Sequence, residues 1–178
     1  MTHSAFWKNS RPAVGIELSK RITPVLSLGT SVMGYINTSS SKTAFDASNV
    51  ELLSKFNMMN LFGGYPGTPR TFEMEAVVGV GWLHGYVNGT GDDNSWGTRL
   101  GMDFNFNIGK EKAWAISLKP SLVYDMEGDF NRHKSRFNAN NARVELLAGI
   151  TYYIKGSSGR HHATLVKEYN QTEVDNLN

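Results

Sequence analysis

The sequence predicts an all-β fold, an antiparallel up-and-down sheet of long strands, and three observations lead to it. Apolar and polar residues alternate over seven segments, which is the period of a β-strand with two unlike surroundings. The segments are mostly about ten residues or longer, whereas strands of globular proteins usually have about 5–6 residues. The connections alternate between short turns and longer polar stretches, as in up-and-down barrels that cross membranes.

The alternation is clearest in residues 95–108, where Leu100 and Phe104 share one face while Arg99 and Asp103 share the other. The seven segments, in chain order, are residues 11–20, 25–36, 50–62, 72–86, 95–108, 113–126 and 141–155. Tilted strands that span a membrane need about 9–11 residues, so these lengths favour a transmembrane barrel.

Each of the other six segments has an apolar side of its own. In chain order, these sides are Val14, Ile16 and Leu18; Leu26, Leu28, Val32 and Ile36; Val50, Leu52, Phe56, Met58 and Phe62; Phe72, Met74, Ala76, Val78, Val80 and Trp82; Trp114, Ile116, Leu118, Leu122 and Tyr124; and Ala142, Val144, Leu146, Ala148, Ile150, Tyr152 and Ile154. The third segment is the least regular, because Leu53 and Met59 interrupt its alternation.

The connections fall into two classes of length. Residues 21–24 and 109–112 are tight turns, and residues 63–70 are intermediate and rich in Gly and Pro. The longer polar stretches are residues 37–49, 87–94 and 127–140. In an up-and-down sheet the two classes lie at opposite ends, so we expect the longer stretches outside the cell and the short turns in the periplasm.

Aromatic residues collect toward the ends of the segments, where a membrane–water interface favours Trp and Tyr. Toward the long connections lie Tyr35, Trp82, Tyr86, Trp96 and Tyr124, and toward the short turns lie Phe62, Tyr65, Phe72, Trp114, Tyr152 and Tyr153. The alternative is that aromatic residues are simply frequent in strands. The residues expected to face lipid or to form the girdles are Trp82, Leu100, Phe104, Phe106, Trp114 and Tyr152.

The sides opposite the apolar stripes carry eleven charges, namely Glu17, Glu51, Lys55, Glu73, Glu75, Arg99, Asp103, Lys119, Asp125, Arg143 and Glu145. Unpaired charges are too costly for a dry core, so these sides face water or line a narrow barrel in which opposite charges pair. Glycines fall on the same sides, and small residues beside long charged ones suit a packed lumen. The expected lumen charge network is Glu17, Glu73, Glu75, Arg99, Asp103, Lys119, Arg143 and Glu145.

Composition excludes several classes of function. The 178 residues carry a formal charge of +2 and no cysteine, and no Lys/Arg run indicates nucleic acid. Glu73 and Glu75 share a face, but no nucleophile–base pair stands beside them, and the adjacent His161 and His162 make a poor chelate. We therefore expect no enzyme, no catalytic, cofactor-binding or metal site, and no small-molecule substrate. The first residues show no signal-peptide pattern, which taken literally predicts a cytosolic protein; the alternative is that the sequence starts inside a longer precursor.

Four runs of residues carry a family resemblance. Residues 56–65 (FNMMNLFGGY), 70–73 (RTFE), 78–82 (VGVGW) and 149–155 (GITYYIK) together resemble the barrel domain of OmpA-like outer-membrane porins. Residues 169–178 look like the start of the linker that leads, in that family, to a peptidoglycan-binding domain.

The resemblance implies an eight-stranded transmembrane barrel of the OmpA type, with about seven strands in this chain. It implies an irregular segment at residues 1–10, the barrel at 11–155 and a periplasmic tail at 156–178. The first strand and the signal peptide are then missing, as is the domain through which the family contacts peptidoglycan. The expected location is the bacterial outer membrane, with its lipid as partner.

The function that follows is structural: a membrane anchor of the Gram-negative cell envelope with a narrow, plugged lumen and with surface recognition by the long connections. One alternative is a soluble calycin-like barrel that buries Thr98, Leu100, Met102, Phe104 and Phe106 around an apolar ligand. A further alternative is a pore for ions or small solutes, which would need an open lumen.

Overall fold

In the computed structural model the chain forms one curled sheet of seven long strands. The structure describes residues 11–36, 44–86, 93–126, 142–156 and 158–164. The strands are β1 Ala13–Arg21, β2 Leu26–Ile36, β3 Phe45–Asn57, β4 Phe72–Gly85, β5 Asp93–Ile108, β6 Trp114–Met126 and β7 Ala142–Tyr152. Each strand pairs with the next one along the chain, and every pair is antiparallel. The predicted all-β, up-and-down topology is therefore confirmed.

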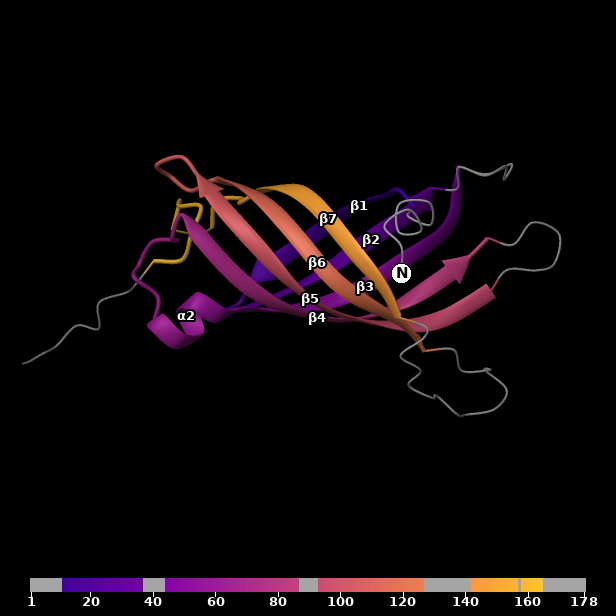
Figure 1. The fold of residues 1–178 in the computed structure, drawn as a ribbon. Helices are drawn as coiled ribbons and strands as arrows, with labels where there is room; N and C mark the ends of the chain where they lie inside the picture. The colour runs from indigo at the N-terminus through magenta and orange to yellow at the C-terminus, as the bar shows by residue number, and fades with distance from the viewer. Residues whose placement is uncertain (1–10, 37–43, 87–92, 127–141, 157, 165–178) are drawn as a thin grey trace, which may run out of the picture.

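The sheet is strongly curved and encloses a concave face, so that its shape is a half-barrel (Figure 1). In a flat sheet, five strand spacings of about 4.8 Å would place β1 roughly 24 Å from β6. In the structure, Nζ of Lys119 on β6 lies 2.9 Å from Oε2 of Glu17 on β1. The curl therefore brings side chains from opposite ends of the strand order into direct contact.

The half-barrel has two distinct ends. The turn end holds the β1–β2 turn, the segment between β3 and β4, and the β5–β6 turn. The loop end holds the strand ends that flank residues 37–43, 87–92 and 127–141, which lie outside the described residues. Both edge strands, β1 and β7, run from the loop end to the turn end, and in the described residues they are not paired with each other.

The prediction of a strand over residues 50–62 is wrong in its second half. Strand β3 begins earlier, at Phe45, and ends at Asn57, after which Met58–Gly63 forms the short helix α2. The Asn57 side chain caps the helix by accepting from the amide of Asn60 at 2.9 Å, and Gly64 follows the helix with φ +68°. No helix in the described residues is both long and apolar enough to cross a membrane.

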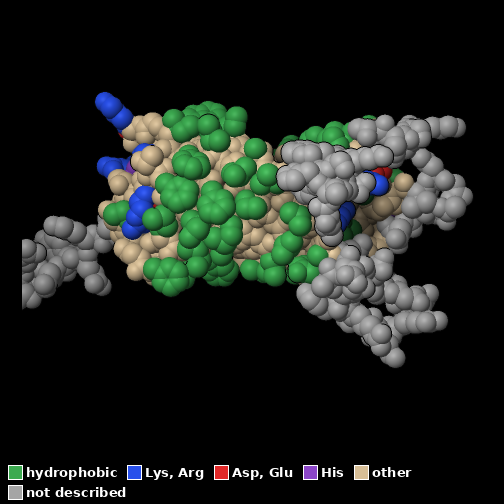
Figure 2. All heavy atoms as spheres, in the orientation of Figure 1, with side chains coloured by type: hydrophobic (Ala, Val, Ile, Leu, Met, Phe, Trp, Pro, Cys, Tyr) green, Lys and Arg blue, Asp and Glu red, His purple; other side chains and the backbone are tan. Residues whose placement is uncertain are grey.

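In a water-soluble barrel the inner face is apolar and the outer face is polar. In this sheet the arrangement is reversed. Large apolar side chains on the convex face are exposed, among them Ile16 (80%), Leu52 (68%) and Ile150 (77%). The concave face instead buries polar groups, including Glu51 (1% exposed) and Glu73 (2% exposed). Figure 2 shows the apolar side chains gathered over the outer surface of the strands, with Lys and Arg side chains at the turn end.

Candidate functional site

The concave face is the candidate site, because strand alternation directs nearly all buried charges of the described residues to it. In β5 the odd-numbered residues point inward and the even-numbered ones outward, so Arg99 and Asp103 are buried while Leu100 is half exposed. The same alternation in the other strands brings inward most of the charges that the sequence assigned to a lumen network. Asp125 lies on β6, but its side chain is outside the described residues.

Arg99 is the centre of the first group of ion pairs, which we call the Arg99 cluster: Arg99, Glu51, Glu145, Ser121 and Tyr35. Its guanidinium donates to Glu51 Oε2 at 2.8 Å, to Glu145 Oε2 at 2.9 Å and to Ser121 Oγ at 2.7 Å. The Tyr35 hydroxyl donates to the other oxygen of Glu145 at 2.6 Å. These contacts join strands β2, β3, β5, β6 and β7 across the concave face.

Arg143 lies at the edge of this cluster rather than inside it. Its guanidinium carbon is 5.0 Å from the centre of the Tyr35 ring, a cation–π arrangement, and its side chain is exposed. The Ser31 hydroxyl completes the cluster on the opposite side by donating to Glu51 Oε2 at 3.1 Å.

A second group, the Lys55 cluster, consists of Lys55, Lys119, Glu17 and Asp103. Lys55 is 5% exposed and donates to Asp103 Oδ2 at 2.7 Å and to Glu17 Oε1. Lys119 lies 2.9 Å from Glu17 and 3.6 Å from Asp103. Two cations and two carboxylates therefore alternate around one centre and neutralise each other, which is the condition for keeping charges in a confined space.

The inward side of the sheet nearer the turn end is held by amide–carboxylate contacts. Asn105 donates to Glu75 Oε2 at 3.0 Å, and the Ser117 hydroxyl donates to Asn105 Oδ1 at 2.6 Å. Asn107 donates to the backbone oxygen of Arg70 at 2.8 Å and to Glu73 Oε2 at 3.2 Å. Glu73 and Glu75 are thus part of a hydrogen-bonded lining, in which each accepts from an asparagine amide.

Some apolar residues also point inward, although the sequence pattern does not predict this position for them. Met33, Leu53, Val77, Leu83 and Val123 are all buried on the concave face. The disturbed alternation at Leu53 is the one signal of this group that the sequence carries. These side chains fill space between the charged clusters and leave less room for water there.

The convex face carries the residues that the sequence predicted to face lipid. Leu100, Phe106 and Tyr152 are each 50% exposed, Trp114 is 51% exposed and Trp82 is 43% exposed. Phe104 is partly covered, because its ring stacks against that of Phe72 with centroids 6.4 Å apart.

The aromatic residues at the two ends divide into outward and inward sets. At the loop end, the rings of Trp82, His84 and Tyr86 follow one another on the convex face, with successive centroids 5.2 and 4.7 Å apart. Tyr35 and Tyr153 are not girdle residues as predicted: Tyr35 is only 6% exposed and bonds Glu145, and Tyr153 faces Arg21. Their positions follow from strand parity: Tyr35 is an odd-numbered residue of β2, Tyr153 directly follows β7, and the even-numbered residues of both strands point outward.

The turn end is stabilised by contacts from the segment after β7. The Tyr65 hydroxyl donates to the backbone oxygen of Ala163 at 2.7 Å, and burial raises the pKa of this hydroxyl. His161 bonds the backbone oxygen of Tyr153, so it is not arranged with His162 as a chelate. Among the described residues, no three His, Asp or Glu side chains lie close enough together to hold a metal ion.

A glycine supplies a specific test of how tightly the concave face is packed. A Cβ at Gly81 would lie 2.5 Å from Cγ of Glu51 and 2.5 Å from the backbone oxygen of Val50, whereas a Cβ at Gly149 would meet only Cε of Lys119, at 3.9 Å. We expect Gly81→Ala to lower the free energy of unfolding by about 1–3 kcal/mol. Gly149→Ala, the matched control, should change it by less than about 0.5 kcal/mol. Urea unfolding of both variants measures the difference, and equal effects would contradict close packing at Gly81.

Comparison of the chain with protein-family models, with curated proteins and with solved structures finds no match. The geometry of the two faces is therefore the basis on which a function can be proposed.

Proposed function

We propose that this chain is a transmembrane β-barrel of the Gram-negative outer membrane, related to the OmpA type, with a structural, membrane-anchoring role. The observation that carries the proposal is the inverted polarity of the sheet. Its concave face holds paired, buried charges, while its convex face exposes an apolar belt. In water such a belt is an aggregation hazard, whereas in a bilayer it is the surface that lipid requires.

The alternative of a soluble barrel around an apolar ligand is not supported by the same geometry. That fold needs Leu100 and Phe106 inside, but both are half exposed on the convex face. The interior positions that a ligand would occupy are held by the Arg99 and Lys55 clusters, and burying an apolar ligand against paired charges brings no favourable contact.

The ion pairs also favour a narrow, plugged lumen over an open pore. Lys55 of β3 and Lys119 of β6 both pair with Glu17 of the edge strand β1, and Arg99 of β5 pairs with Glu145 of the edge strand β7, so these contacts cross the concave face. In barrels of about eight strands, side chains fill the interior. We therefore expect no steady conductance in planar-bilayer recordings, and a stable open level of conductance would favour the pore instead.

Closure of the barrel requires more than the seven strands described. In a bilayer, unpaired backbone groups cost several kcal/mol each, so open edges on β1 and β7 are not tolerated against lipid. One further strand between β1 and β7 gives the eight-stranded form. In this proposal the turn end is periplasmic and the loop end faces the outside, where the connections offer a surface for recognition. Peptidoglycan contact through a further domain is part of the same proposal.

The first test is the behaviour of the purified chain. We expect it to need detergent for solubility and, after refolding in detergent, to migrate differently on a gel before and after boiling, because its long hydrogen-bonded strands and buried ion pairs resist unfolding by the gel detergent at room temperature. A monomer that is folded and fully soluble without detergent would contradict the membrane proposal. Unfolded chain kept in urea, which has one mobility only, is the control.

A second test locates the convex face relative to the bilayer. Three single-tryptophan variants keep Trp82, Trp114 or a new tryptophan at Leu100, with the other tryptophans changed to Phe. In vesicles of brominated lipid, we expect bromines deep in the acyl chains to quench the Leu100→Trp variant most. Bromines near the headgroups should quench Trp82 and Trp114 most, because these residues lie toward the two ends. Absence of quenching at all three positions would place the convex face in water.

A further inference from the structure

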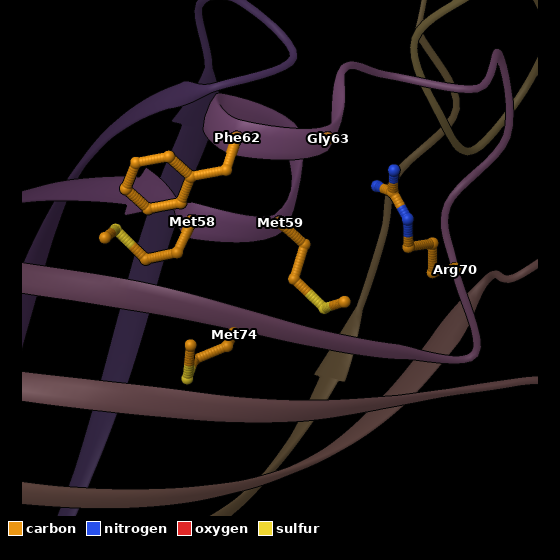
Figure 3. A pocket seen from close by; sticks show the side chains of 6 residues that line it. All are labelled: Met58, Met59, Phe62, Gly63, Arg70 and Met74. Atoms are coloured by element: carbon orange, nitrogen blue, oxygen red, sulfur yellow. The ribbon is translucent and has the colours of Figure 1, made fainter.

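A pocket lies on the convex face at the turn end, between helix α2 and strand β4 (Figure 3). It has a volume of about 470 Å³ and is lined by Met58, Met59, Phe62, Gly63, Arg70 and Met74. Met74 belongs to the outward set of β4 and pairs with Phe104 of β5, so the floor of the pocket continues into the apolar belt. Three flexible thioether side chains suit a surface that adapts to an apolar chain without a fixed shape.

The helix that covers the pocket is held in place by polar contacts. The Asn60 side chain donates to the backbone oxygen of Pro24 at 2.9 Å and accepts from Arg70. Arg70 also donates to the backbone oxygen of Gly64 at 2.7 Å. The pocket is therefore a built feature in which Arg70 connects the end of α2 to the start of β4.

One cation, Arg70, lines this pocket, and a second, Lys112, reaches the residue next to it. Arg70 bonds an amide oxygen and a backbone oxygen, both neutral. Lys112 extends from the β5–β6 turn to the hydroxyl of Thr71, the residue after Arg70, at 3.1 Å, and to the backbone oxygen of Asn107 at 3.3 Å. Within the described residues neither forms a salt bridge, whereas Lys55, Arg99 and Lys119 of the concave face are each paired with a carboxylate. An apolar slot with two unbalanced positive charges matches an anionic amphiphile.

We propose that this pocket binds an anionic phospholipid of the leaflet at the turn end, with one acyl chain against Met58, Met59 and Met74 and the phosphate at Arg70 and Lys112. A guanidinium and an ammonium are the side chains that phosphate oxygens prefer. Free phosphate would satisfy the charges but leave the apolar slot empty, so the lipid is the occupant that uses both parts. The inference rests on the proposed membrane location, since only then is lipid present at the convex face.

The test compares how well the full chain retains two lipids in detergent–lipid micelles. The probes are phosphatidylglycerol and phosphatidylcholine with identical acyl chains, and native mass spectrometry detects the lipid that stays bound. We expect phosphatidylglycerol to be retained in preference to phosphatidylcholine. Lys112→Gln should lower this preference about fivefold, the effect of one cation near an anionic headgroup. Lys110→Gln, which removes an equal charge from the same turn, is the matched control and should leave the preference nearly unchanged.

Filling the slot tests the acyl-chain part separately. We expect Met74→Trp to reduce retention of both lipids, whereas Leu118→Trp, a similar change elsewhere on the convex face, should not. Arg70→Lys keeps the positive charge but weakens the contacts that anchor α2. Because the phosphate is bound by charge, this variant should keep the preference for phosphatidylglycerol. Equal retention of the two lipids by the unaltered chain, or equal effects of Lys112→Gln and Lys110→Gln, would overturn the proposal.

These outcomes are distinguishable from failure of the membrane proposal itself. If the lipid preference is absent but the chain still needs detergent and still shows heat-modifiable mobility, the pocket inference alone is wrong. If the chain is folded and soluble without detergent, both are wrong.

Discussion

Replacing Leu100 by arginine should lower the free energy of unfolding of the refolded chain in vesicles by about 2–4 kcal/mol, the cost of an arginine at the middle of a lipid-facing strand. Leu100 lies near the middle of β5 and is half exposed on the convex face. In water, a charged residue at such an exposed position would be harmless or favourable. The sign and size of the effect therefore separate a bilayer environment from an aqueous one.

The control for this experiment lies on the same strand and the same face. Ile108 is 48% exposed, as Leu100 is 50% exposed, but it ends β5 at the turn end. Ile108→Arg should cost about 0–1 kcal/mol, because an arginine near the interface extends its guanidinium into water. Urea unfolding of both variants in vesicles measures the difference. Equal and small effects would show that depth does not matter and that the convex face is not embedded in lipid.

Loss of Arg99 is the second change with a large expected effect. Arg99→Met leaves Glu51, which is 1% exposed, without its guanidinium partner, and it also breaks the contact with Glu145. Removing one partner of a buried pair costs about 3–5 kcal/mol, because the remaining charge stays desolvated. We expect a loss of stability in that range for Arg99→Met, measured by urea unfolding in detergent.

The double variant distinguishes an unpaired charge from lost packing. Adding Glu51→Gln to Arg99→Met removes the stranded carboxylate, so the double variant should be more stable than the sum of the two single changes predicts. Arg11, which pairs with Asp46 but is 69% exposed, supplies the comparison. Arg11→Met should cost about 0–1 kcal/mol, as exposed pairs usually do. Strict additivity of Arg99→Met and Glu51→Gln would mean that the two side chains do not act as a pair.

The fold was predictable from the sequence because its dominant signal is local. A period of two over long segments fixes which residues share a face, and Arg99 and Leu100 were assigned to opposite faces from that pattern alone. The helix α2 is not predictable with certainty from the pattern. Leu61 and Phe62 follow Met58 by three and four residues, which is a helical spacing. Met58 and Phe62 are also even-numbered, like the outward residues of β3, so over so short a stretch they equally continue the strand pattern.

The pairing of the charges was not predictable, because it depends on register and curl. The sequence places Glu17 and Lys119 on polar sides, yet it gives no reason for them to meet, since they are 102 residues apart. Only the curvature of the sheet brings β1 to β6. The inward position of Val77 is unpredictable for a related reason: both of its neighbours, Ala76 and Val78, are also apolar, so alternation leaves it unassigned.

The number of strands limits which strands can pair with the open edges of β1 and β7. The described residues form seven strands, and because seven is an odd number, β1 and β7 run in the same direction. Joining them directly would need a parallel ladder in an otherwise antiparallel sheet. A second copy inserted with the same orientation adds seven strands, but its β7 would also meet β1 in parallel. Antiparallel closure therefore requires added strands that run opposite to β7 and β1 where they meet them, and a single strand is the smallest addition that does so.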